Sequence, residues 1–204
     1  MFITFEGTEG SGKTTQIGRL VKELSEANYS VQSTREPGGT TVGDQIRSIL
    51  LNPLNERLFP TSELLLYAAS RAQHVREVIV PALKNGEIVI SDRFADASVA
   101  YQSYGRNLNL TLIAQLNRIA TDGLVPDLTF LLDLPVEIGL QRASHSRGTL
   151  DRIEREKLEF HRRVQTGYLS LAEEAPDRIR VVDATKPMDV IYQEIWSTIQ
   201  KKMS

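Results

Sequence analysis

Five short apolar segments along the chain alternate with longer segments in which apolar residues recur every three or four positions. The short segments have the length and composition of buried strands, and they occupy residues 2–5, 31–34, 88–91, 128–132 and 179–182. The longer segments have the helical period; one follows residue 14, and the others cover 45–51, 60–79, 110–120, 135–143, 153–171 and 191–199. Pro81 is expected to kink or end the helix of 60–79. The alternation predicts an α/β fold with helices on both faces of a five-stranded parallel sheet.

The first strand runs directly into a segment that matches G-x-x-x-x-G-K-[ST] without exception. Its glycines let the backbone wrap with the N–H groups turned inward, Lys13 supplies a cation for the outer phosphates, and the Thr14 hydroxyl can ligate Mg²⁺. The amides at the start of the following helix complete the anion site. The sequence therefore predicts a nucleotide-phosphate site in a P-loop NTPase core with three α/β/α layers. The site consists of Gly7, Thr8, Glu9, Gly10, Ser11, Gly12, Lys13, Thr14 and Thr15.

Composition limits the domain organisation, the partners and the cellular compartment that we expect for the protein. The 204 residues are most simply one domain, and the net charge of −2 with scattered basic residues gives no electrostatic footprint for nucleic acid. The chain has no Cys, which excludes thiolate metal sites and fits a reducing compartment. It also has no apolar run long enough to span a bilayer. We expect a cytoplasmic protein without a membrane partner.

An acidic residue at a strand end is the expected second contact for Mg²⁺. Asp92 and Asp133 both follow apolar runs, so this pattern alone does not choose between them. Arg93 favours Asp92, because phosphate chemistry needs a cation beside the metal. Asp133 is then interpreted as structural.

Several segments suggest a second ligand. Tyr67, Arg71 and His74 share a helical stripe, and an aromatic and an arginine one turn apart can grip a flat anionic ligand; an ordinary amphipathic boundary is the alternative. The other histidines share no metal-ligand spacing and are interpreted as bystanders. A polar-aromatic cluster follows the third strand, and a Pro-Gly-Gly loop follows the second. These features contain Asp96, Ser98, Tyr101 and Gln102, and Glu36, Pro37, Gly38 and Gly39.

Residues 142–152 combine small polar side chains with Arg142, Arg147 and Arg152. Small hydrophilic residues predict mobility and the arginines predict an anion, so this segment is expected to be a small mobile lid over triphosphate. A basic solvated loop is the alternative.

These segments together resemble the thymidylate kinases over nearly the whole chain. The resemblance rests on FEGTEGSGKTT at 5–15, TREPGGT at 34–40, LLYAASRAQH at 65–74, DRFADASVAYQ at 92–102, PDLTFLLD at 126–133 and RGTLDRIE at 147–154. It implies an ATP- and Mg²⁺-dependent enzyme that converts dTMP to dTDP, and a homodimer.

The resemblance also implies roles for individual residues. Arg47 and Arg93 hold the dTMP phosphate, and Glu9 approaches the acceptor sugar and the magnesium region. Around the base, Tyr67 stacks on thymine, Arg71 bonds its edge, Ser98 and Gln102 add polar contacts, and Tyr101 crowds a 2′-OH. Arg35 and the loop of Glu36, Pro37, Gly38 and Gly39 shape the acceptor side. Arg142 and the loop of residues 183–185 are the candidates for contacts with adenine.

The phosphate loop carries no basic residue between Gly7 and Gly12. The chain therefore resembles the class of thymidylate kinases in which the lid supplies the cation, with Arg147 and Arg152 as candidates. Lys13, Asp92, Arg93 and Glu9 complete the expected catalytic set. Two alternatives remain open: another nucleotide kinase acting on dUMP, dCMP or a nucleoside, and a nucleotide-sensing module with incidental turnover.

Overall fold

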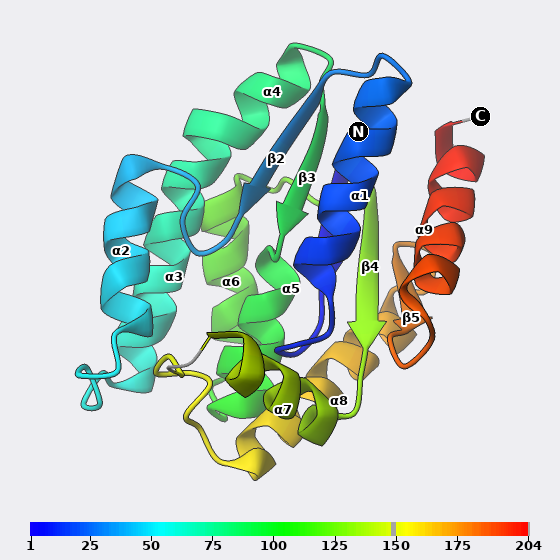
Figure 1. Ribbon diagram of the computed structural model, residues 1–204. Coiled ribbons are helices and arrows are strands. Elements are labelled where there is room, and N and C mark those ends of the chain that lie inside the picture. Colours follow the sequence, from blue (N-terminus) through cyan, green and yellow to red (C-terminus); the bar gives the residue numbers. More distant parts are fainter. Residues whose placement is uncertain (148–149, 204) are drawn as a thin grey trace.

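The computed structural model of the protein describes residues 1–147 and 150–203, with the backbone alone at 146 and 147. A parallel sheet forms its centre, with the strand order β2-β3-β1-β4-β5 (Figure 1). The strands are β1 (Phe2–Glu6), β2 (Val31–Arg35), β3 (Ile88–Asp92), β4 (Leu128–Asp133) and β5 (Ile179–Asp183). The prediction of a five-stranded parallel sheet is confirmed.

Both faces of the sheet are buried, because residues of alternating direction on each strand meet helices. On β1, Ile3 and Phe5 pack in a cluster with α1 (Lys13–Glu26) and α9 (Met188–Met203), whereas Phe2 packs on the other face. That second face is covered by α4 (Val80–Lys84), α5 (Ala95–Ser98) and α8 (Leu158–Glu174), which contribute residues to the clusters on that side. Helices α3 (Pro60–His74) and α6 (Leu110–Thr121) pack against each other, and α6 also packs on α5. The three-layer α/β/α architecture is therefore confirmed.

Two helical boundaries differ from the sequence prediction. Helix α2 (Thr41–Leu51) begins four residues earlier than expected, because the Thr40 side chain caps it by accepting a 2.9 Å hydrogen bond from the Gly43 amide. Helix α8 begins at Leu158 rather than near 153.

Pro81 neither kinks nor ends its helix in the expected way. A π-helical segment, η1 (Val75–Ile79), joins α3 to α4, and Pro81 lies in the first turn of α4. A proline is tolerated there because it interrupts no intrahelical hydrogen bond. The helical path continues to Lys84, just before Asn85 and Gly86.

The segments on either side of the expected ligand cavity are helical. After β3 the chain forms α5 and a second π-helical segment, η2 (Val99–Gly105). Helix α7 (Val136–Arg147) reaches into the segment expected to be the lid. In Figure 1, α7 lies below the sheet, beside the carboxyl ends of the central strands. Among the described residues, no helix is long and apolar enough to cross a membrane.

Candidate active site

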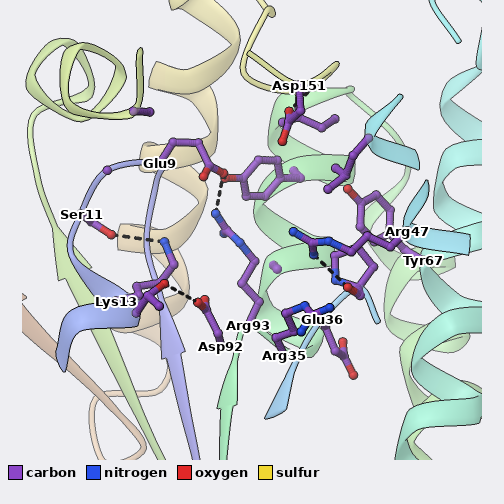
Figure 2. Close-up of a pocket in the computed structure, with 18 of the residues that line it drawn as sticks. Glu9, Ser11, Lys13, Arg35, Glu36, Arg47, Tyr67, Asp92, Arg93 and Asp151 are labelled. Atoms are coloured by element: carbon purple, nitrogen blue, oxygen red, sulfur yellow. Dashed lines mark hydrogen bonds and ion pairs between the residues drawn. The ribbon is translucent and has the colours of Figure 1, made fainter. Parts of the chain in front are cut away.

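A cavity of about 330 Å³ opens at the carboxyl ends of β1, β2 and β3. Ligand sites of open parallel sheets lie at this edge, where strand order reverses. In Figure 2, Ser11 and Lys13 lie on one side of Arg93, and Arg47 and Tyr67 lie on the other. The cavity therefore has a phosphate-loop side and a second, arginine-rich side.

The phosphate loop has the backbone that its glycines predict. Gly10 and Gly12 have φ values of 68° and 92°, in the left-handed region where a side chain is strained. Lys13 Nζ donates to the carbonyl oxygens of Gly7 and Thr8 at 3.0 and 2.9 Å. Burial, with a contribution from nearby Arg93, lowers the pKa of Lys13 to about 8. A polyanion in the loop is expected to raise the pKa of this lysine again and to favour its charged form.

Helix α7 touches the phosphate loop through two glycines. A Cβ atom on Gly10 would collide with the carbonyl of Gly139, and one on Gly139 would collide with the carbonyl of Glu9. The first turns of α7, which lead to Arg142, therefore pack directly on the loop. The sequence analysis missed Gly139, because an isolated glycine in a helical pattern does not reveal its partner.

The two residues predicted to contact Mg²⁺ lie together. The Thr14 hydroxyl donates to Oδ2 of Asp92 at 3.2 Å, and both residues line the cavity. Asp133 does not line it, and its carboxylate accepts a hydrogen bond from Gln165 at 2.7 Å. No group of three His, Cys, Asp or Glu side chains within the described ranges could hold a metal ion. The pair therefore fits an ion that takes most of its ligands from substrate phosphates and water, as Mg²⁺ does.

Arg93 lies between the two sides of the cavity in a constrained conformation. Its φ is 73°, which is unfavourable for a residue with a side chain. Nη2 donates to Glu9 at 2.6 Å and Nη1 donates to the Tyr168 hydroxyl at 2.9 Å. The Tyr101 hydroxyl also donates to Glu9, at 3.1 Å. The predicted group of Glu9, Arg93 and Tyr101 is therefore assembled, with Tyr168 as an additional member.

Glu6 contacts this group through Tyr168, and the sequence analysis gave Glu6 no role in the site. Its carboxylate accepts hydrogen bonds from the Phe94 amide and the Tyr168 hydroxyl, both at 2.7 Å. Burial, followed by the nearby charge of Asp96, raises the pKa of Glu6 to about 8. Tyr168 therefore connects Arg93 to a carboxyl group that is largely neutral at pH 7.

The arginine-rich side contains three residues that the sequence predicted for the acceptor nucleotide. Arg47, Tyr67 and Pro37 line the cavity, and Arg47 Nη1 donates to the Pro37 carbonyl at 2.9 Å. Burial and the charge of Glu63 raise the pKa of Tyr67, so its ring is a neutral aromatic surface. A flat base and an anionic group can be held together here.

Arg71 is more deeply buried than its predicted role suggests, with 2% of its surface exposed. It does not line the cavity. Its guanidinium donates to Glu36 at 2.7 Å and to Ser98 at 2.8 Å, and Glu36 also pairs with His74 at 3.0 Å. Ser98 and Glu36 do line the cavity. Arg71 therefore holds lining residues in place, and His74, the possible exception among the histidines, supports Glu36.

The predicted lid arginines have different outcomes. Arg142 lines the cavity. Arg152 does not: it is 8% exposed, and it donates to the Leu50 carbonyl at 2.7 Å and to Glu63 at 2.6 Å. The Arg147 side chain lies outside the described part of the structure. The expectation that Arg152 reaches the transferring phosphate has no support in this geometry.

A phosphate loop, a Thr14–Asp92 pair that fits Mg²⁺ and a second, arginine-rich side in one cavity are the features expected of a P-loop phosphotransferase. A family model of thymidylate kinase matches residues 5–195. The chain belongs to the thymidylate kinase family, whose members phosphorylate dTMP.

Individual relatives agree with this assignment. The thymidylate kinase of Deinococcus radiodurans is 52% identical over 99% of this chain and 97% of its own length. That of Geobacter sulfurreducens is 56% identical over 95% of this chain and 97% of its own. The crystal structure of thymidylate kinase from Ehrlichia chaffeensis matches with a TM-score of 0.80 and 36% identity, over 98% of both chains.

Proposed function

We propose that this enzyme transfers the γ-phosphoryl group of MgATP to the phosphate of dTMP, giving dTDP and ADP. The observation that carries the proposal is the single cavity, in which Lys13 and Asp92 lie on one side and Arg47 and Tyr67 on the other, with Arg93 between them. This arrangement brings two polyanionic substrates together.

The phosphate loop, with Lys13, binds the triphosphate of ATP through inward-facing amides and one cation. Thr14 and Asp92 would hold Mg²⁺, which would neutralise phosphate charge. Arg142 lies on the cavity wall and is our candidate for an adenine contact.

The acceptor dTMP lies on the opposite side. Arg47 and Arg93 hold its phosphate, and Tyr67 stacks on thymine. Tyr101, whose hydroxyl is bonded to Glu9, crowds the position of a ribose 2′-OH. Gln102 and Ser98 face the base from the π-helical segment η2 and the end of α5.

The transfer needs no general base, because the acceptor phosphate oxygen is already anionic near neutral pH. The barrier comes mainly from repulsion between the substrates, so the arginines and Lys13 act by positioning the phosphates and neutralising their charge. We assign the cation on the transferring group to Arg147, and we place residues 142–152 as a lid over the triphosphate. In related phosphoryl transfers, an arginine of this kind accelerates the reaction by roughly 10³–10⁵.

We also propose a homodimer. Helix α3 packs between α2 and α6, and these three helices carry six large apolar side chains that are exposed in the monomer. They are Val42, Ile49, Leu65, Leu110, Leu112 and Ile119. Burying such a layer against a second copy is favourable in proportion to its apolar area. A cytoplasmic location is proposed because MgATP and dTMP are cytoplasmic metabolites.

Product analysis tests the proposal. Phosphorus NMR of a mixture of protein, ATP, Mg²⁺ and dTMP is expected to show dTDP and ADP appearing in equal amounts. ADP formation without dTDP would indicate an ATPase, and a phosphate on the sugar hydroxyl would indicate a nucleoside-type kinase. Either result would overturn the assignment of the acceptor atom.

A further inference from the structure

The side chain of Glu63, in the first turn of α3, binds side chains from two other parts of the chain, the end of η2 and the region of Arg152. Its carboxylate accepts hydrogen bonds from Gln102 Nε2 at 3.0 Å, from Nε and Nη2 of Arg106 at 3.1 Å each, and from Arg152 Nη2 at 2.6 Å. The side chain of Glu63 has no exposed surface. None of these contacts belongs to the phosphate transfer itself, although Gln102 lines the acceptor side of the cavity.

The carboxylate of Glu63 is ionised at neutral pH. Burial alone would raise its pKa, but the hydrogen bonds and charge of Arg106, with help from Gln102 and Arg152, lower it instead. An ionised carboxylate accepts hydrogen bonds and cannot donate one. A neighbouring amide can therefore meet Glu63 only through its NH₂ group.

This restriction fixes the side chain of Gln102. Its nitrogen faces Glu63, so its carbonyl oxygen faces the other way. Among the residues that the structure describes, none donates a hydrogen bond to Gln102 Oε1. Because Gln102 lines the cavity, this oxygen is the acceptor that remains for a bound base.

Ser98, which also lines the cavity, offers a hydrogen-bond donor where Gln102 offers an acceptor. Its oxygen accepts a hydrogen bond from Arg71 Nη1 at 2.8 Å, and the hydroxyl hydrogen remains available to an acceptor in the cavity. One acceptor and one donor match the edge of thymine or uracil, where an N3–H lies between two carbonyl oxygens. Cytosine presents a lone pair at N3 and an amino group at position 4, so it mismatches both.

We propose that Glu63 is a specificity-determining positioning residue, which orients the Gln102 amide so that its carbonyl oxygen accepts the N3–H of a thymine or uracil ring and rejects cytosine. This inference rests on the proposed function, since it assumes that the base of the acceptor nucleotide lies beside Gln102. Arg106 has the supporting part of keeping Glu63 charged.

The substitution Glu63→Gln tests the inference with little change of shape. The new amide can donate to Gln102 Oε1, so the Gln102 side chain is free to turn over. The ratio of kcat/KM for dTMP to that for dCMP is expected to fall by about 5- to 150-fold, the range that corresponds to leaving a buried hydrogen-bonding group without its partner. If both kcat/KM values fall by the same factor and the ratio is unchanged, Glu63 has only a structural role and the inference is overturned.

Two further variants make the test specific. Glu156→Gln removes the second carboxylate bound to Arg106, at 2.6 Å. Glu156 forms no hydrogen bond with Gln102 in the described part of the structure, so this variant is expected to leave the ratio unchanged. Gln102→Met removes the amide, and Glu63→Gln is expected to cause no further loss of selectivity in that background. If Glu63→Gln lowered the selectivity of Gln102→Met as much as it lowers that of the wild type, Glu63 would not act through Gln102.

A measurement on the wild-type protein covers the case in which Glu63→Gln does not fold. The side-chain amide protons of Gln102, identified in a ¹⁵N-glutamine-labelled sample by their loss in Gln102→Met, are expected to exchange slowly and to keep their shift when dTMP binds. Fast exchange, or a large shift of these protons, would show that the nitrogen faces the base. If the wild-type enzyme prefers dCMP, the proposed function fails; if it prefers dTMP and Glu63→Gln leaves the dTMP-to-dCMP ratio unchanged, only this inference fails.

Discussion

The Arg93 guanidinium donates a 2.6 Å hydrogen bond to the Glu9 carboxylate, so the end of strand β3 and the phosphate loop share one ion pair. The pair lies at the boundary between the two sides of the cavity (Figure 2). A ligand phosphate that binds to Arg93 has to share this cation with Glu9. Tyr168 helps to hold the Arg93 guanidinium in position, because its hydroxyl accepts a 2.9 Å hydrogen bond from Nη1.

Arg93→Ala is expected to lower kcat/KM for dTMP by roughly 100-fold or more, because each hydrogen bond to a charged group contributes about 1.5–3 kcal/mol. KM for MgATP is expected to change much less, since the phosphate loop remains intact. Steady-state kinetics with each substrate varied in turn measures both effects. Arg76→Ala is the control, because Arg76 is exposed and its one ion pair with a described residue is that with Asp122, at 3.6 Å. Equal losses for both substrates would contradict an acceptor role for Arg93.

Glu6 predicts a pH dependence of stability. Its pKa in the folded protein is about 8, raised from 4.5 by burial. Between these two values the folded state holds a proton that the unfolded state releases, so the free energy of unfolding falls as the pH rises. Each pKa unit corresponds to about 1.4 kcal/mol, so the loss across this window is expected to reach a few kcal/mol.

Glu6→Gln imitates the protonated carboxyl group and removes this dependence. Urea unfolding between pH 5 and 8.5 is expected to show a smaller decline for Glu6→Gln than for the wild-type protein. Glu137→Gln is the control, since Glu137 is exposed and Arg162 lowers its pKa, so both states are ionised throughout. Parallel curves for wild type and Glu6→Gln would show that Glu6 does not hold a proton in the folded state.

Substitutions of the two predicted lid arginines are expected to affect different properties, stability for Arg152 and kcat for Arg147. Arg152→Ala leaves Glu63 with one fewer partner in a buried site, so it is expected to lower the free energy of unfolding by up to about 3–5 kcal/mol. Arg147→Ala is expected to lower kcat by roughly 10³-fold, with little change in dTMP binding. Unfolding curves and kinetics of both variants decide the matter. Near-normal turnover of Arg147→Ala would remove the assignment of Arg147 to the transferring phosphate.

The apolar layer on α2, α3 and α6 predicts a dimer of twice 22.9 kDa, or about 46 kDa. Light scattering during size-exclusion chromatography measures this mass. Ile119→Glu, which places a charge at an exposed position of α6, is expected to shift the mass to that of a monomer. Val190→Glu is the matched control on α9, on the other face of the sheet. A monomeric wild-type protein would contradict the proposed assembly.

The sequence was sufficient for the sheet and the phosphate loop because both are encoded locally. Each buried strand is a short apolar run, and the loop motif occupies eight consecutive positions, Gly7 to Thr14. The start of α2 was placed too late because its signal is the Thr40 side chain, which can equally be a loop residue. The η1 segment was not predicted, because no proline or glycine within Val75–Ile79 marks it in the sequence.

The site was predictable where residues act on the ligand and less so where they act on each other. Thr14 and Asp92, 78 positions apart, were both expected to contact Mg²⁺, and they do lie together. Glu63 and Tyr168 fell only within the predicted helical segments 60–79 and 153–171 and received no role, because their partners are far away in sequence. The role of Arg152 depends on Glu63, 89 positions earlier. A sequence displays charges, but the pairing of charges follows from the fold.

The most direct test of the central claim is ADP release by the enzyme with MgATP and a panel of dTMP, dUMP, dCMP, dGMP, AMP and UMP. We expect dTMP to give the highest kcat/KM, dCMP to be poor because its base mismatches Gln102 and Ser98, and UMP to be poor because Tyr101 crowds its 2′-OH. A protein whose ADP release is stimulated by none of these monophosphates would contradict the account, and only the phosphate site at Gly7 to Thr14 would remain.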